Sequence, residues 1–173
     1  MFQGPSGSGK TTLQKKLGVP RVITWTTRKP RPTEKNGIDY NFVTLEEFNE
    51  MEKRGLMLEV TEYNSNFYGT SINSIETIGD ECVSVVVDKY GAQKIKNLVG
   101  DKCFRIGVFA SKEDCMSRLL ERTQIMDDIK KRLKDYDSEV KALFDCDIII
   151  NNSNSNWGNA DRIVNHIKGL LNI

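Results

Sequence analysis

A single histidine, His166, occurs among the 173 residues of this chain. It falls near the C-terminus in a helical pattern, and we expect it on a helix surface or half-buried there. Any catalysis by this protein must therefore proceed without a histidine base.

Long apolar runs are also missing. No run approaches the roughly 18 residues of a membrane-spanning helix, and the first ten residues lack the apolar centre of a signal peptide. The net charge of +1 is too small for a general nucleic-acid binder. These absences predict a cytoplasmic protein that binds neither membrane nor nucleic acid, and 173 residues suit one domain.

No C-x-x-C pair occurs among the four cysteines, Cys82, Cys103, Cys115 and Cys146. We therefore expect buried free thiols, and neither a zinc site nor a disulfide scaffold.

Apolar, β-branched runs alternate with helical patterns along the chain. Strands are expected over 22–27, 82–87, 104–109 and 147–150. Helices are expected over 44–54, 90–98, 111–122 and 127–143, with a last one carrying Ile163 and Ile167. The first and third of these helices begin with the cap residues Thr44 and Ser111. Alternation of this kind predicts an α/β fold with a parallel sheet flanked by helices.

The run GPSGSGKT, residues 4–11, matches the phosphate-loop pattern G-x-x-x-x-G-K-[ST]. Its glycines let successive backbone N–H groups point at phosphate oxygens. Lys10 can reach the β- and γ-phosphates of ATP, and the Thr11 hydroxyl can ligate Mg²⁺. Only three residues precede Gly4, so either the strand before the loop is very short or residues ahead of this sequence belong to it. The expected ATP-binding residues here are Gly4, Pro5, Ser6, Gly7, Ser8, Gly9, Lys10, Thr11 and Thr12.

A second anion site is expected in TTRKPRPTEKNGIDYNF, residues 26–42. Arg28 and Arg31 can hold a phosphate with a fork geometry that lysine lacks, and Tyr40 and Tyr68 can add phenolic donors. A solvated basic loop is the alternative. Residues 39–70 interrupt the strand–helix alternation with short aromatic-rich runs, which suggests a small inserted β-rich lobe.

The chain resembles the guanylate kinase family in these motifs and in GLMLEVTEYNSNFYGTS, VDKYGAQKIK, RLLERT…KKRL and DIIINNS. The matching pieces cover most of the chain in family order. The resemblance implies ATP-dependent phosphorylation of GMP and dGMP to GDP and dGDP. It also implies a single domain with a core (about 1–38, 71–121 and 133–173), a GMP-binding lobe (about 39–70) and a helical lid (about 122–132).

The resemblance also implies residue roles. Arg28, Arg31, Tyr40 and Tyr68 match the clamp on the GMP phosphate, and Glu59 matches the carboxylate that reads the guanine edge. The other implied GMP-binding residues are Thr24, Gly69, Thr70 and Asp88. Arg118 and Asn151 are implied on the ATP side, and the implied catalytic residues are Lys10, Arg28, Arg122 and Arg132.

Two departures accompany the resemblance. Val86 stands where the family often has the first Asp of Asp-x-Asp, and the lid is about one residue shorter. An inactive, protein-binding guanylate-kinase-like module is one alternative function, although the intact phosphate loop argues against it. A kinase of another (deoxy)nucleoside monophosphate is a second, with Trp25 beside Thr24 as the residue that raises it. Both monomer and homodimer stay open.

Overall fold

The computed structural model of the chain describes residues 1–63, 65–76, 82–122 and 125–171. Residue 64 of the expected lobe, 77–81 of the expected core and 123–124 of the expected lid lie outside this part. Within it, no helix is both long and apolar enough to cross a membrane.

A parallel sheet forms the centre of the core. Its strands pair in the order β1-β6-β7, and these are β1 (Phe2–Gln3), β6 (Ile106–Phe109) and β7 (Ile148–Asn151). On its other side β1 forms a parallel bridge from Phe2 to Val86, and Ser84 in turn bridges to Arg21. Within this sequence the strand before the phosphate loop comprises Phe2 and Gln3, and neighbours pair with it on both sides.

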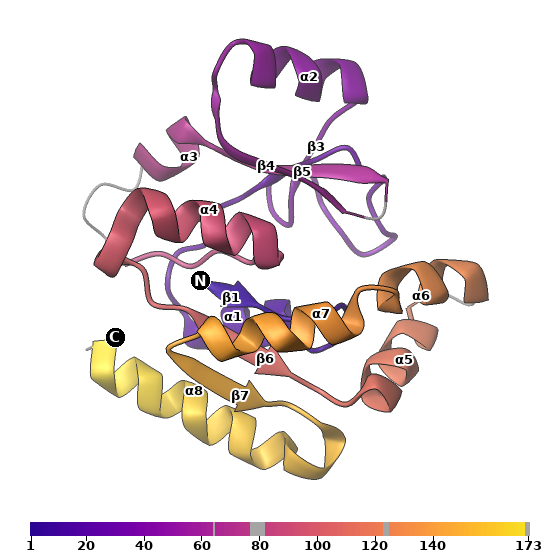
Figure 1. Cartoon of the computed structure of the whole chain (residues 1–173), viewed down its shortest axis with the longest axis vertical. Coiled ribbons are helices and arrows are strands. Elements are labelled where there is room, and N and C mark those ends of the chain that lie inside the picture. The colour runs from indigo at the N-terminus through magenta and orange to yellow at the C-terminus, as the bar shows by residue number, and fades with distance from the viewer. Residues whose placement is uncertain (64, 77–81, 123–124, 172–173) are drawn as a thin grey trace.

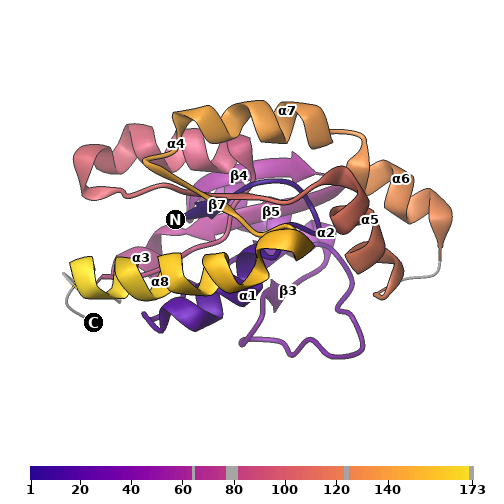
Figure 2. The same ribbon diagram turned by 90° about the horizontal axis from the view of Figure 1, so that it is seen from below.

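Helices cover both faces of this sheet (Figure 2). One face carries α1 (Lys10–Leu17) and α8 (Trp157–Leu171), and the other carries α4 (Lys89–Val99) and α7 (Tyr136–Lys141). Beneath α1 and α8 lies an apolar core of Phe2, Leu13, Leu17, Val108, Ile150, Val164 and Ile167. His166 is exposed on α8, as expected. Three short 3₁₀ helices connect elements of the core: Gly100–Lys102, Ala142–Asp145 and Asn154–Asn156.

A second sheet builds the lobe above the core (Figure 1). Its strands pair in the order β3-β2-β5-β4, with bounds β2 (Trp25–Thr26), β3 (Asn41–Phe42), β4 (Met57–Tyr63) and β5 (Asn66–Ser71). Helix α2 (Leu45–Lys53) buries Phe48 completely, 5.9 Å from the ring of Phe67. The short α3 (Ile72–Glu76) follows β5. Three strands of this sheet come from the expected lobe, and β2 joins them from residues assigned to the core.

Both predicted helix caps are confirmed. The Thr44 hydroxyl accepts a hydrogen bond from the Glu47 backbone N–H, and the Glu47 carboxylate accepts one from the Thr44 backbone N–H, which completes a capping box. Ser111 accepts from the backbone of Asp114 at the start of α5 (Lys112–Leu120).

The prediction of one continuous helix over 127–143 is wrong. The chain forms α6 (Met126–Leu133) and then α7, with a break at Lys134 and Asp135. Tyr136 causes the new start, because its ring is buried beside Ala110 and Cys115 and its hydroxyl donates to the Ala110 carbonyl at 2.8 Å. That anchor fixes α7 on the core, while α6, which lies in the segment expected to form the lid, is set beside α5 (Figure 1).

The expected strands over 22–27 and 82–87 also need correction. Val22 still donates to Ser84 in the core sheet, but Trp25 pairs with Gly69 in the lobe sheet, so the chain changes sheets between them. The 82–87 run forms only isolated bridges at Ser84 and Val86. All four cysteines have free thiols, but only Cys115 is buried as expected, since Cys103 and Cys146 are half-buried and Cys82 is exposed.

Candidate active site

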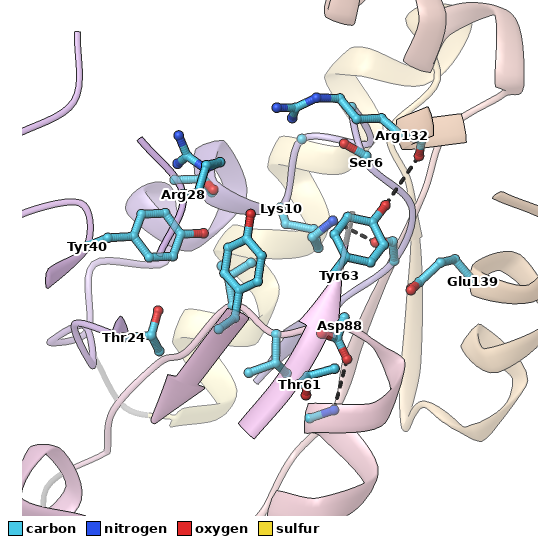
Figure 3. Close-up of a pocket in the computed structure, with 18 of the residues that line it drawn as sticks. Ser6, Lys10, Thr24, Arg28, Tyr40, Thr61, Tyr63, Asp88, Arg132 and Glu139 are labelled. Carbon is cyan, nitrogen blue, oxygen red and sulfur yellow. Dashed lines mark hydrogen bonds between the residues drawn. The ribbon is translucent and has the colours of Figure 1, made fainter. Parts of the chain in front are cut away.

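One cavity collects most of the predicted site residues. It has a volume of about 160 Å³ and is lined by residues of the core, of the lobe sheet and of α6 (Figure 3). An adjoining cleft of about 820 Å³ shares Thr24, Arg31 and Arg122 with it. The predicted residues that line the cavity are Gly4, Ser6, Gly7, Gly9, Lys10, Thr11, Thr12, Thr24, Arg28, Arg31, Tyr40, Glu59, Tyr68, Gly69, Asp88, Arg122 and Arg132.

The phosphate loop joins β1 to α1 and needs glycine for its shape. Gly4 has φ of 141° and Gly9 has φ of 97°, a region that side chains rarely adopt. A β-carbon at Gly4 would collide with the Val108 carbonyl, and one at Gly9 with the Asn152 side chain. The loop can therefore lie close to β6 and still turn its N–H groups toward the cavity.

The Lys10 side chain folds back and bonds to the backbone of this loop. Its ammonium donates to the carbonyls of Gly4 at 2.6 Å and Pro5 at 2.9 Å. Burial lowers the pKa of Lys10, and the Glu139 carboxylate is the strongest of the opposing charges. A phosphate oxygen offers a stronger acceptor than a carbonyl, so Lys10 is ready to exchange these bonds for a nucleotide.

Asn152 and Arg118 support the phosphate loop through hydrogen bonds. The buried Asn152 side chain donates to the Ser8 carbonyl at 2.7 Å. Arg118 donates to the Asn152 carbonyl at 2.6 Å and to the Asn154 side chain at 2.9 Å. Arg118 also donates to the loop carbonyls of Gly7 and Ser8, each at 3.4 Å, so it contacts the loop backbone and does not line the cavity.

The basic loop folds into a paired clamp. Glu34 forms ion pairs of 2.9 Å with both Arg28 and Arg31, and it also accepts from the Arg31 backbone at 2.8 Å. The Arg28 guanidinium lies 5.4 Å from the centre of the Tyr40 ring. Tyr68 lies next to Tyr40, with ring centres 6.1 Å apart. Arg28 and Arg31 are thus held by specific contacts, which argues against a solvated loop.

Four arginines line the cavity, namely Arg28, Arg31, Arg122 and Arg132. Burial and the neighbouring Arg28 lower the pKa of Arg31, Glu34 opposes them, and Arg132 and Arg122 lower it further. Together with Lys10 these arginines place five positive charges at the cavity, and the acidic groups near them are Glu34 in the clamp and the lining carboxylates Glu59, Asp88 and Glu139. Such a site favours ligands with several negative charges, such as two phosphate groups facing each other.

Glu59 forms the lobe wall of the cavity. It is only 6% exposed, and its two oxygens accept from Thr70 at 2.9 Å and from Thr61 at 3.2 Å. Burial raises the pKa of Glu59, while the Thr70 hydroxyl acts against this. Each oxygen keeps a lone pair for a ligand, so the group can accept two adjacent N–H donors.

Two more carboxylates come from the core. Asp88 caps α4 by accepting from the backbone of Tyr90 at 2.8 Å and Gly91 at 2.9 Å. Glu139 enters from α7 and points toward the cavity (Figure 3). Burial raises the pKa of Glu139 to about 7, with Lys10 opposing and Asp88 reinforcing the rise. In the described part of the chain, the Glu139 Oε2 atom has no hydrogen-bond partner.

Five predicted residues do not line this cavity: Pro5, Ser8, Thr70, Arg118 and Asn151. Thr70 acts on the site through Glu59, and Asn151 accepts from the Ser153 backbone at 3.0 Å. The lining residues that the sequence did not suggest include Thr61, Tyr63, Gly91 and Glu139. Glu34 and Asn152 were missed as well, although the acid of the R-x-x-E spacing at Arg31 is visible in the sequence.

The donor set fits a magnesium ion bound together with phosphates. Thr11 lies in the first turn of α1 beside Lys10 and lines the cavity, and the Asp88 carboxylate shares that cavity. Magnesium keeps several waters and takes few protein oxygens when phosphates complete its shell. In the described residues, no group of three or more His, Cys, Asp or Glu side chains could hold a metal without such help.

Comparisons with known proteins point to one family. The sequence model of the family described as guanylate kinase matches residues 1–171. A guanylate kinase from Wolbachia pipientis wMel is 35% identical over 99% of this chain and 88% of its own length. A guanylate kinase from Rubrobacter xylanophilus is 36% identical over 86% of this chain and 83% of its own length. A crystal structure of guanylate kinase from Anaplasma phagocytophilum superposes with a TM-score of 0.76 at 29% identity, covering 98% of this chain and 84% of that one.

The phosphate loop, the clamp and the lobe thus occur in a chain that matches these relatives over nearly its whole length. The chain belongs to the guanylate kinase family, whose members phosphorylate GMP to GDP with ATP.

Proposed function

We propose that the cavity joins the two substrates of this kinase, with the ATP phosphates on the phosphate loop and GMP or dGMP against the lobe. The observation that carries the proposal is the convergence of Lys10, Arg28, Arg31, Arg122 and Arg132 on one cavity whose lobe side ends at Glu59. Arg31, Arg28 and the two tyrosines of the clamp hold the acceptor phosphate. Glu59 accepts from N1–H and the 2-amino group of guanine.

The chemistry needs alignment and charge rather than a base. The acceptor phosphate is largely ionised at neutral pH, because the second pKa of a phosphomonoester is about 6. Lys10 and the lid residues Arg122 and Arg132 neutralise the charge that spreads over the transferred group. Thr11 would hold Mg²⁺, which when bound supplies further positive charge to the phosphates. Arg118 and Asn152 keep the loop in shape behind them.

Closure of the lobe and the lid would exclude water, which would otherwise hydrolyse ATP. No element of the sequence that reads a ribose 2′-hydroxyl is evident, so dGMP should be accepted with GMP.

A mononucleotide profile tests the proposal. The purified protein is incubated with ATP and Mg²⁺ and with GMP, dGMP, AMP, CMP or UMP, and the diphosphate product is measured. Conversion of GMP and dGMP, with the other three at least about 10³-fold lower in kcat/KM, is the expected result. Comparable turnover of AMP or a pyrimidine nucleotide would refute the guanine role of Glu59. Absence of any phosphoryl transfer would favour a protein-binding module.

A further inference from the structure

A hydrogen bond joins the lobe to the lid. The Tyr63 hydroxyl, at the end of β4, donates to the backbone carbonyl of Arg132, near the end of α6, at 3.2 Å across 69 positions of sequence. Both residues line the cavity, and Figure 3 shows the bond at its edge. The sequence motifs do not predict a contact between these two residues.

The bonded carbonyl is one that its own helix leaves without a partner. The last four carbonyls of a helix have no N–H four positions ahead within the helix. Arg132 is the seventh of the eight residues of α6. The next backbone bond at this end, from Lys134, reaches Lys131 and not Arg132. The Tyr63 hydroxyl therefore supplies the partner and fixes the helix end that carries Arg132.

On its other side, Tyr63 contacts the acceptor clamp. Its ring lies 6.5 Å from that of Tyr68 in an edge-to-face arrangement, and Tyr68 lies 6.1 Å from Tyr40. Arg28 lies over the Tyr40 ring. A continuous row of contacts thus runs from the arginine clamp through three tyrosines to the backbone of Arg132.

From this row we infer that Tyr63 is a positioning residue, which sets the lid arginine Arg132 according to the state of the GMP lobe. The inference rests on the proposed roles of Arg132 and of the clamp. When the lobe moves onto GMP, β4 moves with it, and its bond to the Arg132 carbonyl draws the end of α6 along. Arg132 then reaches the transferred phosphoryl group only after the acceptor is in place, which limits hydrolysis of ATP.

The test is a double-mutant cycle on the single-turnover rate constant with ATP and GMP. Tyr63→Phe keeps the ring contact with Tyr68 and removes only the hydroxyl. It should lower the rate constant about three- to tenfold, the size of one hydrogen bond. GMP affinity without ATP, measured by calorimetry, should stay within about twofold, because the clamp is intact. In the Arg132→Met background, Tyr63→Phe should have no further effect, since it acts through Arg132.

Tyr90→Phe is the matched control, because this tyrosine is 60% exposed on α4 and does not line the cavity. It should behave as the wild type in every measurement. Thermal melting of each variant separates lost positioning from lost folding.

Three outcomes overturn the inference while leaving the kinase function intact. Tyr63→Phe could equal the wild type, or it could lower the rate equally with and without Arg132. GMP affinity could also fall in proportion to the rate. If instead Arg132→Met alone leaves the rate unchanged, the proposed role of Arg132 fails and the inference fails with it. A wild type that does not phosphorylate GMP would refute the proposed function itself.

Discussion

Glu34 and Arg28 form an ion pair of 2.9 Å in which the side chains are only 12% and 10% exposed. The same carboxylate holds Arg31, so one acidic group keeps two guanidinium groups in place that would otherwise repel each other. The clamp is therefore organised before an anion arrives.

Glu34→Gln should weaken GMP binding about tenfold, because an amide cannot hold both guanidinium groups by charge-assisted bonds. Calorimetry with GMP alone measures this. Glu50→Gln, at an exposed position on α2, is the control and should bind as the wild type. Tighter GMP binding by Glu34→Gln would mean that Glu34 competes with the phosphate instead of organising its site.

Lys10→Ala should lower kcat about 10²- to 10³-fold, because the ammonium stabilises charge that develops in the transition state. The fold should survive, since the hydrogen bonds that Lys10 makes in the described part of the chain go to carbonyls of its own loop. Circular dichroism and steady-state kinetics check both points. Lys53→Ala, exposed at the end of α2, should keep full activity. Near-normal turnover by a folded Lys10→Ala protein would end the assignment of the phosphate loop.

Glu59→Gln should reduce kcat/KM for GMP by at least about tenfold. The amide offers one acceptor and places an N–H group where the second acceptor is needed. Thr61→Val leaves the carboxylate but removes the weaker of its two hydroxyl donors, so its effect should be smaller. Kinetics with GMP and AMP for the three proteins give the comparison. An unchanged kcat/KM for GMP in Glu59→Gln would mean that the guanine base binds elsewhere.

Glu139 should make stability depend on pH. Its pKa of about 7 lies above the ordinary value of 4.5, so the folded state holds the proton more strongly than the unfolded state. The stabilisation from this proton is complete below about pH 4.5 and is lost as the pH rises through about 7, up to about 3 kcal/mol.

Glu139→Gln, which stays neutral, should therefore gain stability over the wild type as the pH rises from about 4.5 to about 8. Urea unfolding of both proteins at several pH values measures the difference, with Glu113→Gln on α5 as an exposed control. If the two unfolding curves keep a constant separation over this range, Glu139 is not protonated near neutral pH in the folded protein.

Features that depend on neighbouring residues were predictable from the sequence. The Thr44 cap and the phosphate loop need only a few consecutive residues, and both form as expected. The break before α7 was not predictable, because neither Lys134 nor Asp135 is a glycine or proline. It depends on the docking of Tyr136 against Ala110, a contact between residues distant in the sequence.

The missed site residues were not predictable for the same reason, because their contacts join residues distant in the sequence. Glu139 occurs in a polar helical run, where a carboxylate ordinarily faces water, and Asn152 occurs in the polar loop NNSNSN. Only the assembled fold brings Glu139 to Lys10, and Asn152 to Ser8. Tyr63 lies within GLMLEVTEYNSNFYGTS, but no role was predicted for it, because its contact with Arg132 depends on how β4 and α6 meet in the fold.

The brace between Asn152 and Ser8 also sets an order of events during synthesis. The two residues are 144 positions apart, and β1 pairs with β6 more than a hundred residues later. At about 5–20 residues per second, a ribosome makes Asn152 roughly 7–30 s after Ser8. During that interval the nascent chain has a glycine-rich segment but no finished cradle, so nucleotide cannot help the early chain to fold. Binding competence should therefore arrive late and all at once, when the last strand docks.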